Sequence, residues 1–211
     1  MNDAALRQSL CALGRSLFMR GLTHGSTGNL SVRTDTGFLM TPTGGSLGEL
    51  VAERLAELDA DGHHVGGDAP TKEASLHLAV YRARPADRAI VHLHSGHAVA
   101  VSVLADVDPQ NVLPPLTAYY AMRVGTLPLV PYFAPGDGAL AEAVGRLAAR
   151  HAAVLLANHG PIVSGRSLAA AADAIEELEA TSKLWLTVRH EPLRCLTAAQ
   201  LADLEARFPK P

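Results

Sequence analysis

The stretch Ala89-Ile90-Val91-His92-Leu93-His94 decides the architecture of this chain. Its first three residues are apolar, which indicates a buried strand over residues 89–94. Successive side chains of a strand point to opposite faces, so His92 and His94 lie on one face and Leu93 on the other. Two imidazoles placed in this way can bind one metal ion. The sequence therefore predicts a metal site at the end of a central strand.

Two further segments can complete that site. Glu73 follows Pro70-Thr71-Lys72, and His159 lies in Ala157-Asn158-His159-Gly160. Three imidazoles and one carboxylate are a suitable ligand set for a divalent metal. The spacing along the chain does not show whether the fold brings these residues together.

The composition indicates one globular domain over residues 1–211. The chain is 48% hydrophobic and 18% charged, with a formal net charge of −3. This charge gives no reason to expect a nucleic acid or an anionic membrane as partner. No apolar stretch reaches membrane-spanning length, and residues 1–8 lack the layout of a signal peptide. Cys11 and Cys195 form no CxxC motif, so we expect a cytoplasmic protein with free thiols.

Periodicity and capping residues predict an α/β protein. Several strands follow one another too closely for helical crossovers, which favours a mixed or antiparallel sheet. Gly21 is expected to end the first helix, and Thr71, Ser167 and Thr197 to cap three later ones. The predicted elements are a helix over 3–21, strands over 29–33, 38–41 and 55–58, a helix over 72–84, the strand over 89–94, a helix over 96–104, an irregular segment over 106–137, a helix over 138–150, strands over 153–157 and 162–163, and helices over 168–189 and after 197.

Other histidines compete for the metal. His97 is the main competitor, but a helix that begins near Ser95 would turn its side chain away. His77 lies four residues after Glu73, on the same helical face, where it can support that carboxylate. His63 and His64 fall in a turn-rich segment and are expected to be exposed.

Three segments combine glycine or a helix start with hydroxyl or amide side chains. They are residues 25–29 (Gly-Ser-Thr-Gly-Asn), 41–46 (Thr-Pro-Thr-Gly-Gly-Ser) and Thr71-Lys72. Glycine lets backbone amides converge on an anion, and helix N-termini favour phosphate. Each segment alone fits ordinary turn chemistry. Together with a metal site, they suit a small phosphorylated substrate that carries a carbonyl group.

These segments, in this order, resemble the class II aldolase/adducin family over nearly the whole chain. The resemblance implies a three-layer α/β/α fold with a central, mainly antiparallel sheet. It also implies that His92, His94 and His159 bind Zn²⁺, or another divalent metal such as Mn²⁺, and that Glu73 is both a metal ligand and a proton acceptor or donor. Members are commonly cyclic tetramers with active sites at subunit boundaries. The residues that would bind the substrate phosphate are Gly28, Asn29, Thr43, Gly44, Thr71 and Lys72; Thr71-Lys72 replace the paired serines that are common in aldolases.

Within the family, residues 40–43 and 111–125 are most similar to the 3-oxo-tetronate 4-phosphate decarboxylases. That likeness implies release of carbon dioxide and dihydroxyacetone phosphate through a zinc-stabilised enediolate. It also implies a tyrosine proton donor from the neighbouring subunit, for which we select Tyr119, with Tyr120 as the alternative. A Schiff base on Lys72 is a less favoured electron sink, because its expected partner is phosphate.

Three alternatives remain open from the sequence. A sugar-phosphate aldolase of the fuculose-phosphate type, or a related dehydratase or epimerase, would use the same metal site. An adducin-like binding domain would retain the fold without chemistry, and it would have no need of His92, His94, His159 and Glu73. A purely structural zinc site would bind metal without turnover.

Overall fold

The computed structural model describes residues 3–134 and 137–208. Within them, eight strands form one sheet in the order β4-β3-β2-β1-β5-β8-β7-β6. Neighbouring strands are antiparallel except β6 and β7, which are parallel. The strands are β1 Asn29–Arg33, β2 Gly37–Met40, β3 Ala56–Asp59, β4 His64–Gly66, β5 Ala89–His92, β6 Leu129–Val130, β7 Ala153–Leu156 and β8 Gly160–Gly165.

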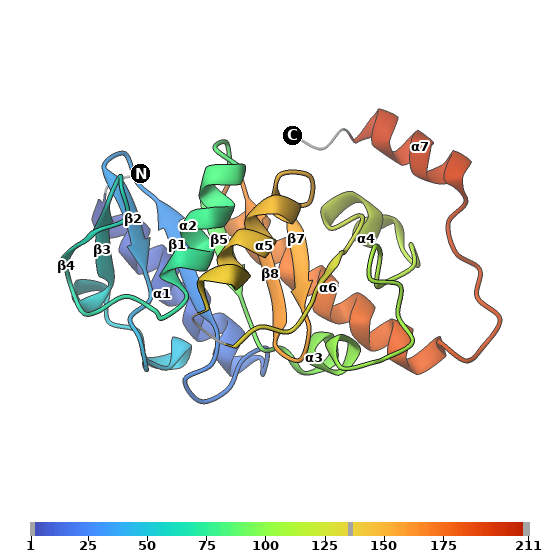
Figure 1. Cartoon of the computed structure of the whole chain (residues 1–211), viewed down its shortest axis with the longest axis horizontal. Coiled ribbons are helices and arrows are strands. Elements are labelled where there is room, and N and C mark those ends of the chain that lie inside the picture. Colours follow the sequence, from blue (N-terminus) through green and yellow to red (C-terminus); the bar gives the residue numbers. More distant parts are fainter. Residues whose placement is uncertain (1–2, 135–136, 209–211) are drawn as a thin grey trace.

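Helices cover both faces of this sheet. They are α1 Asp3–Met19, α2 Ala74–Ala83, α3 Gly96–Ser102, α4 Ala118–Arg123, α5 Gly138–Ala148, α6 Leu168–Val188 and α7 Ala198–Arg207, with short 3-10 turns η1 Leu47–Glu49 and η2 Ala52–Arg54. In Figure 1, α2 and α5 lie side by side in front of the sheet, while α1 and α6 lie behind it. The predicted three-layer α/β/α class is confirmed.

Strand alternation divides the core into two parts. Val91 and Leu155 pack with residues of α1, α3 and α6, whereas Ile90 and Leu156 pack with residues of α2 and α5. The central strands β5 and β7 therefore bury both faces. This explains why β7 is apolar throughout and β5 is apolar up to His92.

Most predicted elements are present, with shifted ends. The strand expected over residues 89–94 leaves the sheet after His92, because α3 begins at Gly96 and the chain must turn before it. The first helix ends at Met19, and Gly21 has a φ of 73° while Leu22 N–H bonds to the carbonyl of Leu17. Ser167 and Thr197 cap α6 and α7 as predicted.

The predicted helix over residues 72–84 starts later, and Thr71 is not its N-cap residue, although the Thr71 hydroxyl accepts from Glu73 N–H. The helix α2 begins at Ala74, with Glu73 in the N-cap position. The Thr71 backbone N–H instead bonds to the carbonyl of Thr41, beside a β-bridge between Pro42 and Pro70. This tie to the neighbouring loop keeps Thr71 out of the helix.

The irregular segment predicted over residues 106–137 was wrong in part; residues 135–136 of it lie outside the described residues. It contains α4, which Thr117 caps through a bond from Tyr120 N–H, and the two-residue strand β6. Both are too short for a periodic pattern. The edge strand β4 was also missed, and His64 lies in it, although exposed as expected.

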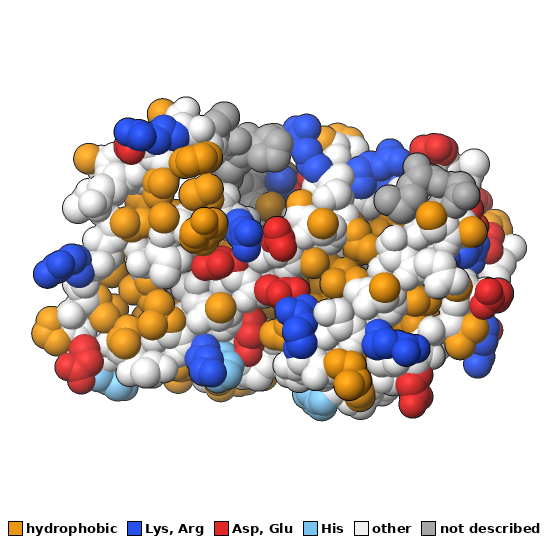
Figure 2. Space-filling view, turned by 180° about the vertical axis from the view of Figure 1, so that it is seen from behind, with side chains coloured by type: hydrophobic (Ala, Val, Ile, Leu, Met, Phe, Trp, Pro, Cys, Tyr) orange, Lys and Arg blue, Asp and Glu red, His pale blue; other side chains and the backbone are white. Residues whose placement is uncertain are grey.

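At the surface, positive and negative side chains alternate over the face drawn in Figure 2, with apolar side chains between them. Figure 1 shows α7 set apart from the body at the end of a long extended segment, with α4 as its nearest helix. Among the described residues, no helix is both long and apolar enough to cross a membrane.

Candidate metal centre

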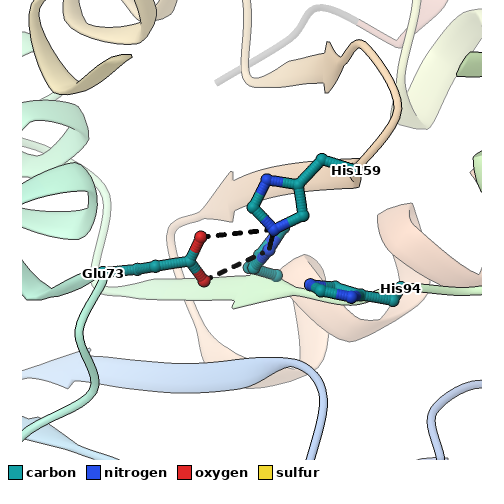
Figure 3. A group of neighbouring side chains, drawn as sticks. Glu73, His94 and His159 are labelled. Carbon is teal, nitrogen blue, oxygen red and sulfur yellow. Dashed lines mark hydrogen bonds and ion pairs between the residues drawn. The ribbon is translucent and has the colours of Figure 1, made fainter. Parts of the chain in front are cut away.

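Four side chains from separate parts of the chain meet at one end of the central strands. Glu73 comes from the start of α2, His92 from the end of β5, His94 from the residues after it, and His159 from the turn between β7 and β8. Figure 3 shows the Glu73 carboxylate pointing to His159, with His94 approaching from the other side. One ligand atom from each of the four lies within 4.8 Å of the others.

The spacing of these atoms fits a small divalent cation. The Nε2 atoms of His92 and His159 are 3.3 Å apart, and each lies 3.3 Å from a carboxylate oxygen of Glu73. With metal bonds of about 2.0–2.1 Å, two ligands of a tetrahedral ion lie roughly 3.3–3.4 Å apart. The Oε1 atom of Glu73 is buried and has no hydrogen-bond partner among the described residues. The donor set therefore fits the metal that the sequence predicts.

The backbone around β5 and β8 orients the imidazoles. His92 Nδ1 lies 2.9 Å from the carbonyl oxygen of Pro161, which can only accept, so this nitrogen carries the hydrogen and the Nε2 lone pair faces the cluster. Asn158 adopts a left-handed conformation with φ 57° in the turn that presents His159. A Cβ at Gly28 would lie 3.0 Å from the carbonyl oxygen of His92. The glycine thus allows the 21–28 loop to pass close behind that ligand.

Burial and charge keep the site ready to bind a cation. Burial, with repulsion from the neighbouring imidazoles, lowers the pKa of His94 to about 3 and also lowers the pKa of His159. Burial would raise the pKa of Glu73, but the charge of His92, the hydrogen bond from Asn29 and the charge of His159 lower it to about 2. At neutral pH His94 and His159 are therefore neutral imidazoles and Glu73 is a carboxylate, the protonation states that metal binding requires.

The competing histidines have other partners. His97 Nδ1 lies 2.7 Å from Glu179 Oε1, and the same carboxylate accepts bonds from the backbone N–H groups of His97 and Ala98. Glu179 of α6 therefore holds the N-terminus of α3, as expected for a helix that turns His97 away. His77 is fully buried and contacts Asn29 and Ser31 rather than the cluster itself.

The residues predicted to bind phosphate are divided between two surroundings. Thr43 and Gly44 line a cavity of about 330 Å³ together with Ser46 and Arg54. Thr71 is buried next to this loop, and Lys72 is exposed. Asn29, by contrast, is buried, and its side chain donates to Glu73 Oε2 at 2.7 Å.

A second cavity, of about 430 Å³, opens on the metal centre, and sequence reasoning missed most of its wall. His94 and His159 line it with His24, Tyr132 and Phe133. Tyr132 follows β6, and Ala157 N–H bonds to the carbonyl of Val130, so the ends of β6 and β7 lie together. Finding Tyr132 required knowledge of β6, which has no pattern of its own.

The predicted tyrosines lie elsewhere in the chain. Tyr119 is 60% exposed on α4, with the guanidinium of Arg123 5.4 Å from its ring centre. Tyr120 is buried, and its hydroxyl has no hydrogen-bond partner among the described residues. Neither lines the 430 Å³ cavity, so a role for Tyr119 in proton transfer requires a neighbouring subunit.

A larger cavity lies away from the proposed metal ligands. It measures about 760 Å³ and is lined by both ends of the β1–β2 turn, by the start of α1 and by Arg166. None of the predicted metal ligands reaches it. We therefore place the candidate site at the 430 Å³ cavity, because His94 and His159 line it, and not at the cavity with the greater volume.

Comparisons with known proteins agree with this geometry. Residues 8–186 match the family described as class II aldolase and adducin N-terminal domain. The chain is 49% identical over 208 residues to a 3-oxo-tetronate 4-phosphate decarboxylase from Haemophilus influenzae, covering 98% of this chain and 99% of that protein. An L-fuculose phosphate aldolase from the same organism is 34% identical over 189 residues, 88% of this chain and 84% of the other.

A solved structure is similar over the same extent. The crystal structure of YgbL from Escherichia coli, a candidate aldolase, epimerase or decarboxylase, superposes with a TM-score of 0.93 at 46% identity. The alignment covers 96% of this chain and 98% of that one. The whole fold, including the segments that carry the four ligands, is therefore shared.

Proposed function

Because the chain belongs to the class II aldolase and adducin family, we propose that it is a metal-dependent lyase that decarboxylates a 3-oxo-tetronate 4-phosphate. The products are dihydroxyacetone phosphate and carbon dioxide. The observation that carries the proposal is the match of nearly half of all residues with a decarboxylase of this name over almost the full length. The complete set Glu73, His92, His94 and His159 supports a catalytic rather than a purely structural domain.

The reaction needs a place for one electron pair and one proton. The bond between the carboxylate and C2 breaks, carbon dioxide leaves, and the electron pair moves toward the C3 ketone. A proton must then reach C2 to give dihydroxyacetone phosphate. A divalent metal bound at this site would supply a positive charge that stabilises the oxygen of that ketone. Zn²⁺ is our first choice because imidazole nitrogens and one carboxylate suit it, with Mn²⁺ as the alternative.

The chain's own residues supply the remaining functions. Glu73 is ionised at neutral pH, so it can accept the proton of a substrate hydroxyl through Oε1, which has no other hydrogen bond among the described residues. Gly28, Thr43, Gly44, Thr71 and Lys72 are proposed to bind the phosphate, with Lys72 as the only positive side chain in this group. The side chain of Asn29, which the family resemblance adds to them, is buried and bonded to Glu73 and His77 instead. Gly44, with φ 71° and open space at its Cβ position, leaves its backbone accessible to an anion.

The proton for C2 has two candidate donors. Tyr119 of a neighbouring subunit is the donor that the family resemblance implies, and it is consistent with a homotetramer that has its active sites at subunit boundaries. Tyr132 of the same chain lines the cavity beside His94 and His159. Replacement of each by Phe, with kcat measured in metal-loaded protein, separates the two.

We place this enzyme in the cytoplasm, in line with the expected free thiols at Cys11 and Cys195.

The deciding experiment supplies the substrate and follows both products. Metal-loaded protein is incubated with 3-oxo-tetronate 4-phosphate, and carbon dioxide and dihydroxyacetone phosphate are measured against time. Equal release of the two is the expected result. A parallel reaction with L-fuculose 1-phosphate tests the aldolase alternative, and faster cleavage there, with no carbon dioxide from the oxo acid, would overturn the proposal. His92→Ala should abolish turnover, whereas His63→Ala, in the exposed turn before β4, is the matched control.

A further inference from the structure

A chain of buried hydrogen bonds leads away from Glu73 into the space between β1 and α2. Asn29 Nδ2 lies 2.7 Å from Glu73 Oε2, and Asn29 Oδ1 lies 2.5 Å from His77 Nε2. His77 Nδ1 is 2.7 Å from the hydroxyl of Ser31, which is 3.0 Å from the hydroxyl of Tyr81. All of these side chains are buried, so water does not compete for the bonds.

Elementary donor rules assign every hydrogen in this chain. The Asn29 NH₂ donates to Glu73 Oε2, so the amide oxygen of Asn29 faces His77. That oxygen can only accept, so His77 carries its hydrogen on Nε2. The ring is completely buried, which favours its neutral form, so Nδ1 has no hydrogen and accepts from Ser31.

The same rules fix the far end. The hydrogen of Ser31 is used in the bond to His77, so its oxygen must accept from Tyr81. Burial raises the pKa of Tyr81, which keeps its phenol protonated as that donor requires. The Tyr81 ring is held in place by Phe38, whose ring centre lies 4.9 Å away, and by the Arg33 guanidinium at 4.8 Å. Each bond therefore points toward Glu73.

We propose that Tyr81, Ser31, His77 and Asn29 are positioning residues that act as one directed chain on Glu73. Their task is to hold the Asn29 amide with its NH₂ on Oε2, so that Oε1 stays free for the metal and for the substrate proton. The amide of Asn29 cannot relay a proton as a hydroxyl or imidazole can. The chain thus orients the carboxylate without giving its proton a path into the core.

This inference rests on the proposed function, because it assigns Glu73 to the metal and the substrate. It predicts effects on metal binding that need no substrate. Outer residues that hold a metal ligand typically change metal affinity about 10–100-fold when removed. We expect Asn29→Ala to weaken metal affinity by about 10–100-fold. His77→Phe, which removes both hydrogen bonds of the ring, should weaken it by about tenfold. His77→Gln retains an N–H that can reach Asn29 and should restore much of the affinity.

The test measures Co²⁺ affinity by competition with a chelator, in full-length protein whose folding is checked by circular dichroism. Ser31→Ala is compared with Ser164→Ala, a matched control in which a buried serine of β8, on the other side of β5 from Ser31, loses a bond to Asp87 and none in the chain that leads to Glu73. Weaker Co²⁺ binding in Ser31→Ala than in Ser164→Ala is expected. Equal Co²⁺ affinity in folded His77→Phe and unchanged protein would overturn the proposal.

A second readout is independent of folding defects. Nitrogen NMR of the metal-loaded, unchanged protein reports which ring nitrogen of His77 carries the hydrogen. The directed chain predicts hydrogen on Nε2 and none on Nδ1. Hydrogen on Nδ1 would reverse the direction of the chain and refute the assignment. These measurements involve no turnover, so they can fail while decarboxylation is observed, or succeed while it is not.

Discussion

The loop that passes behind His92 offers a sharp test of how the backbone supports the metal centre. Gly28 has φ 79°, and a Cβ there would lie 3.0 Å from the His92 carbonyl oxygen and 3.2 Å from Leu93 Cδ2. Gly25 has φ 54° in the same loop, but its Cβ position is open. Alanine at either position therefore adopts a left-handed conformation, and only Gly28→Ala also crowds a ligand strand.

The magnitudes follow from that contrast. The left-handed conformation costs an alanine about 1–2 kcal/mol, which both variants share. Displacing β5 by a few tenths of an ångström adds a destabilisation of about 1–3 kcal/mol in a packed core, because neighbouring side chains are forced from their preferred rotamers and lose contacts. We expect Gly28→Ala to lower the free energy of unfolding by about 1–3 kcal/mol more than Gly25→Ala does.

Urea denaturation of the metal-free variants measures this difference, and chelator competition measures their metal affinity. Because the crowded atom is the carbonyl of a ligand residue, Gly28→Ala should also bind metal more weakly than Gly25→Ala. Equal stability and equal metal affinity in the two variants would refute the reasoning that the glycine is there for close approach to His92.

Three other predictions address separate parts of the site. The metal-free protein should lose stability as pH falls below about 6.5, because His77 takes up a proton in the unfolded state but not in the folded state, where burial lowers its pKa to about 3. This one residue accounts for about 1.4 kcal/mol of unfolding free energy per pH unit, and His77→Gln should reduce the slope of stability against pH by that amount. Glu179→Gln removes the charge that holds the N-terminus of α3, and thermal unfolding should show a loss of about 1–3 kcal/mol, with Asp173→Asn, at an exposed position of the same helix, as the control. In metal-loaded protein, Tyr132→Phe should lower kcat with unchanged metal content if this residue is the proton donor, and an effect confined to Tyr119→Phe would assign the donor to the neighbouring subunit.

The candidate metal residues could be named from the sequence, His92 and His94 from a local pattern, and Glu73 and His159 with the help of the family resemblance. Strand alternation places His92 and His94 on one face, and Asn158-His159-Gly160 ends an apolar run that pairs with the same sheet. His97 could be set aside because a helix follows Ser95. These inferences depend on the spacing of a few neighbouring residues, whereas the meeting of Glu73 and His159 with the His92/His94 pair depends on the fold.

Features that depend on distant pairs could not be predicted in the same way. Tyr132 lies at the site because β6 is parallel to β7, a pairing between two-residue and four-residue strands with little pattern of their own. The Asn29 amide bonds to Glu73 because α2 packs near β1 in the fold. The sequence indicated Asn29 only as a candidate phosphate ligand and did not predict this bond. Thr71 has the residue type of a helix cap, but the tie between its loop and Thr41 takes precedence.

The central claim is that one divalent metal, held by Glu73, His92, His94 and His159, is required for decarboxylation. A single titration tests it most directly: protein stripped by a chelator is reloaded with Zn²⁺, and bound metal and carbon dioxide release are measured on the same samples. Turnover is predicted to rise in proportion to bound metal and to level off at one ion per chain. Full turnover in the stripped protein would contradict the account.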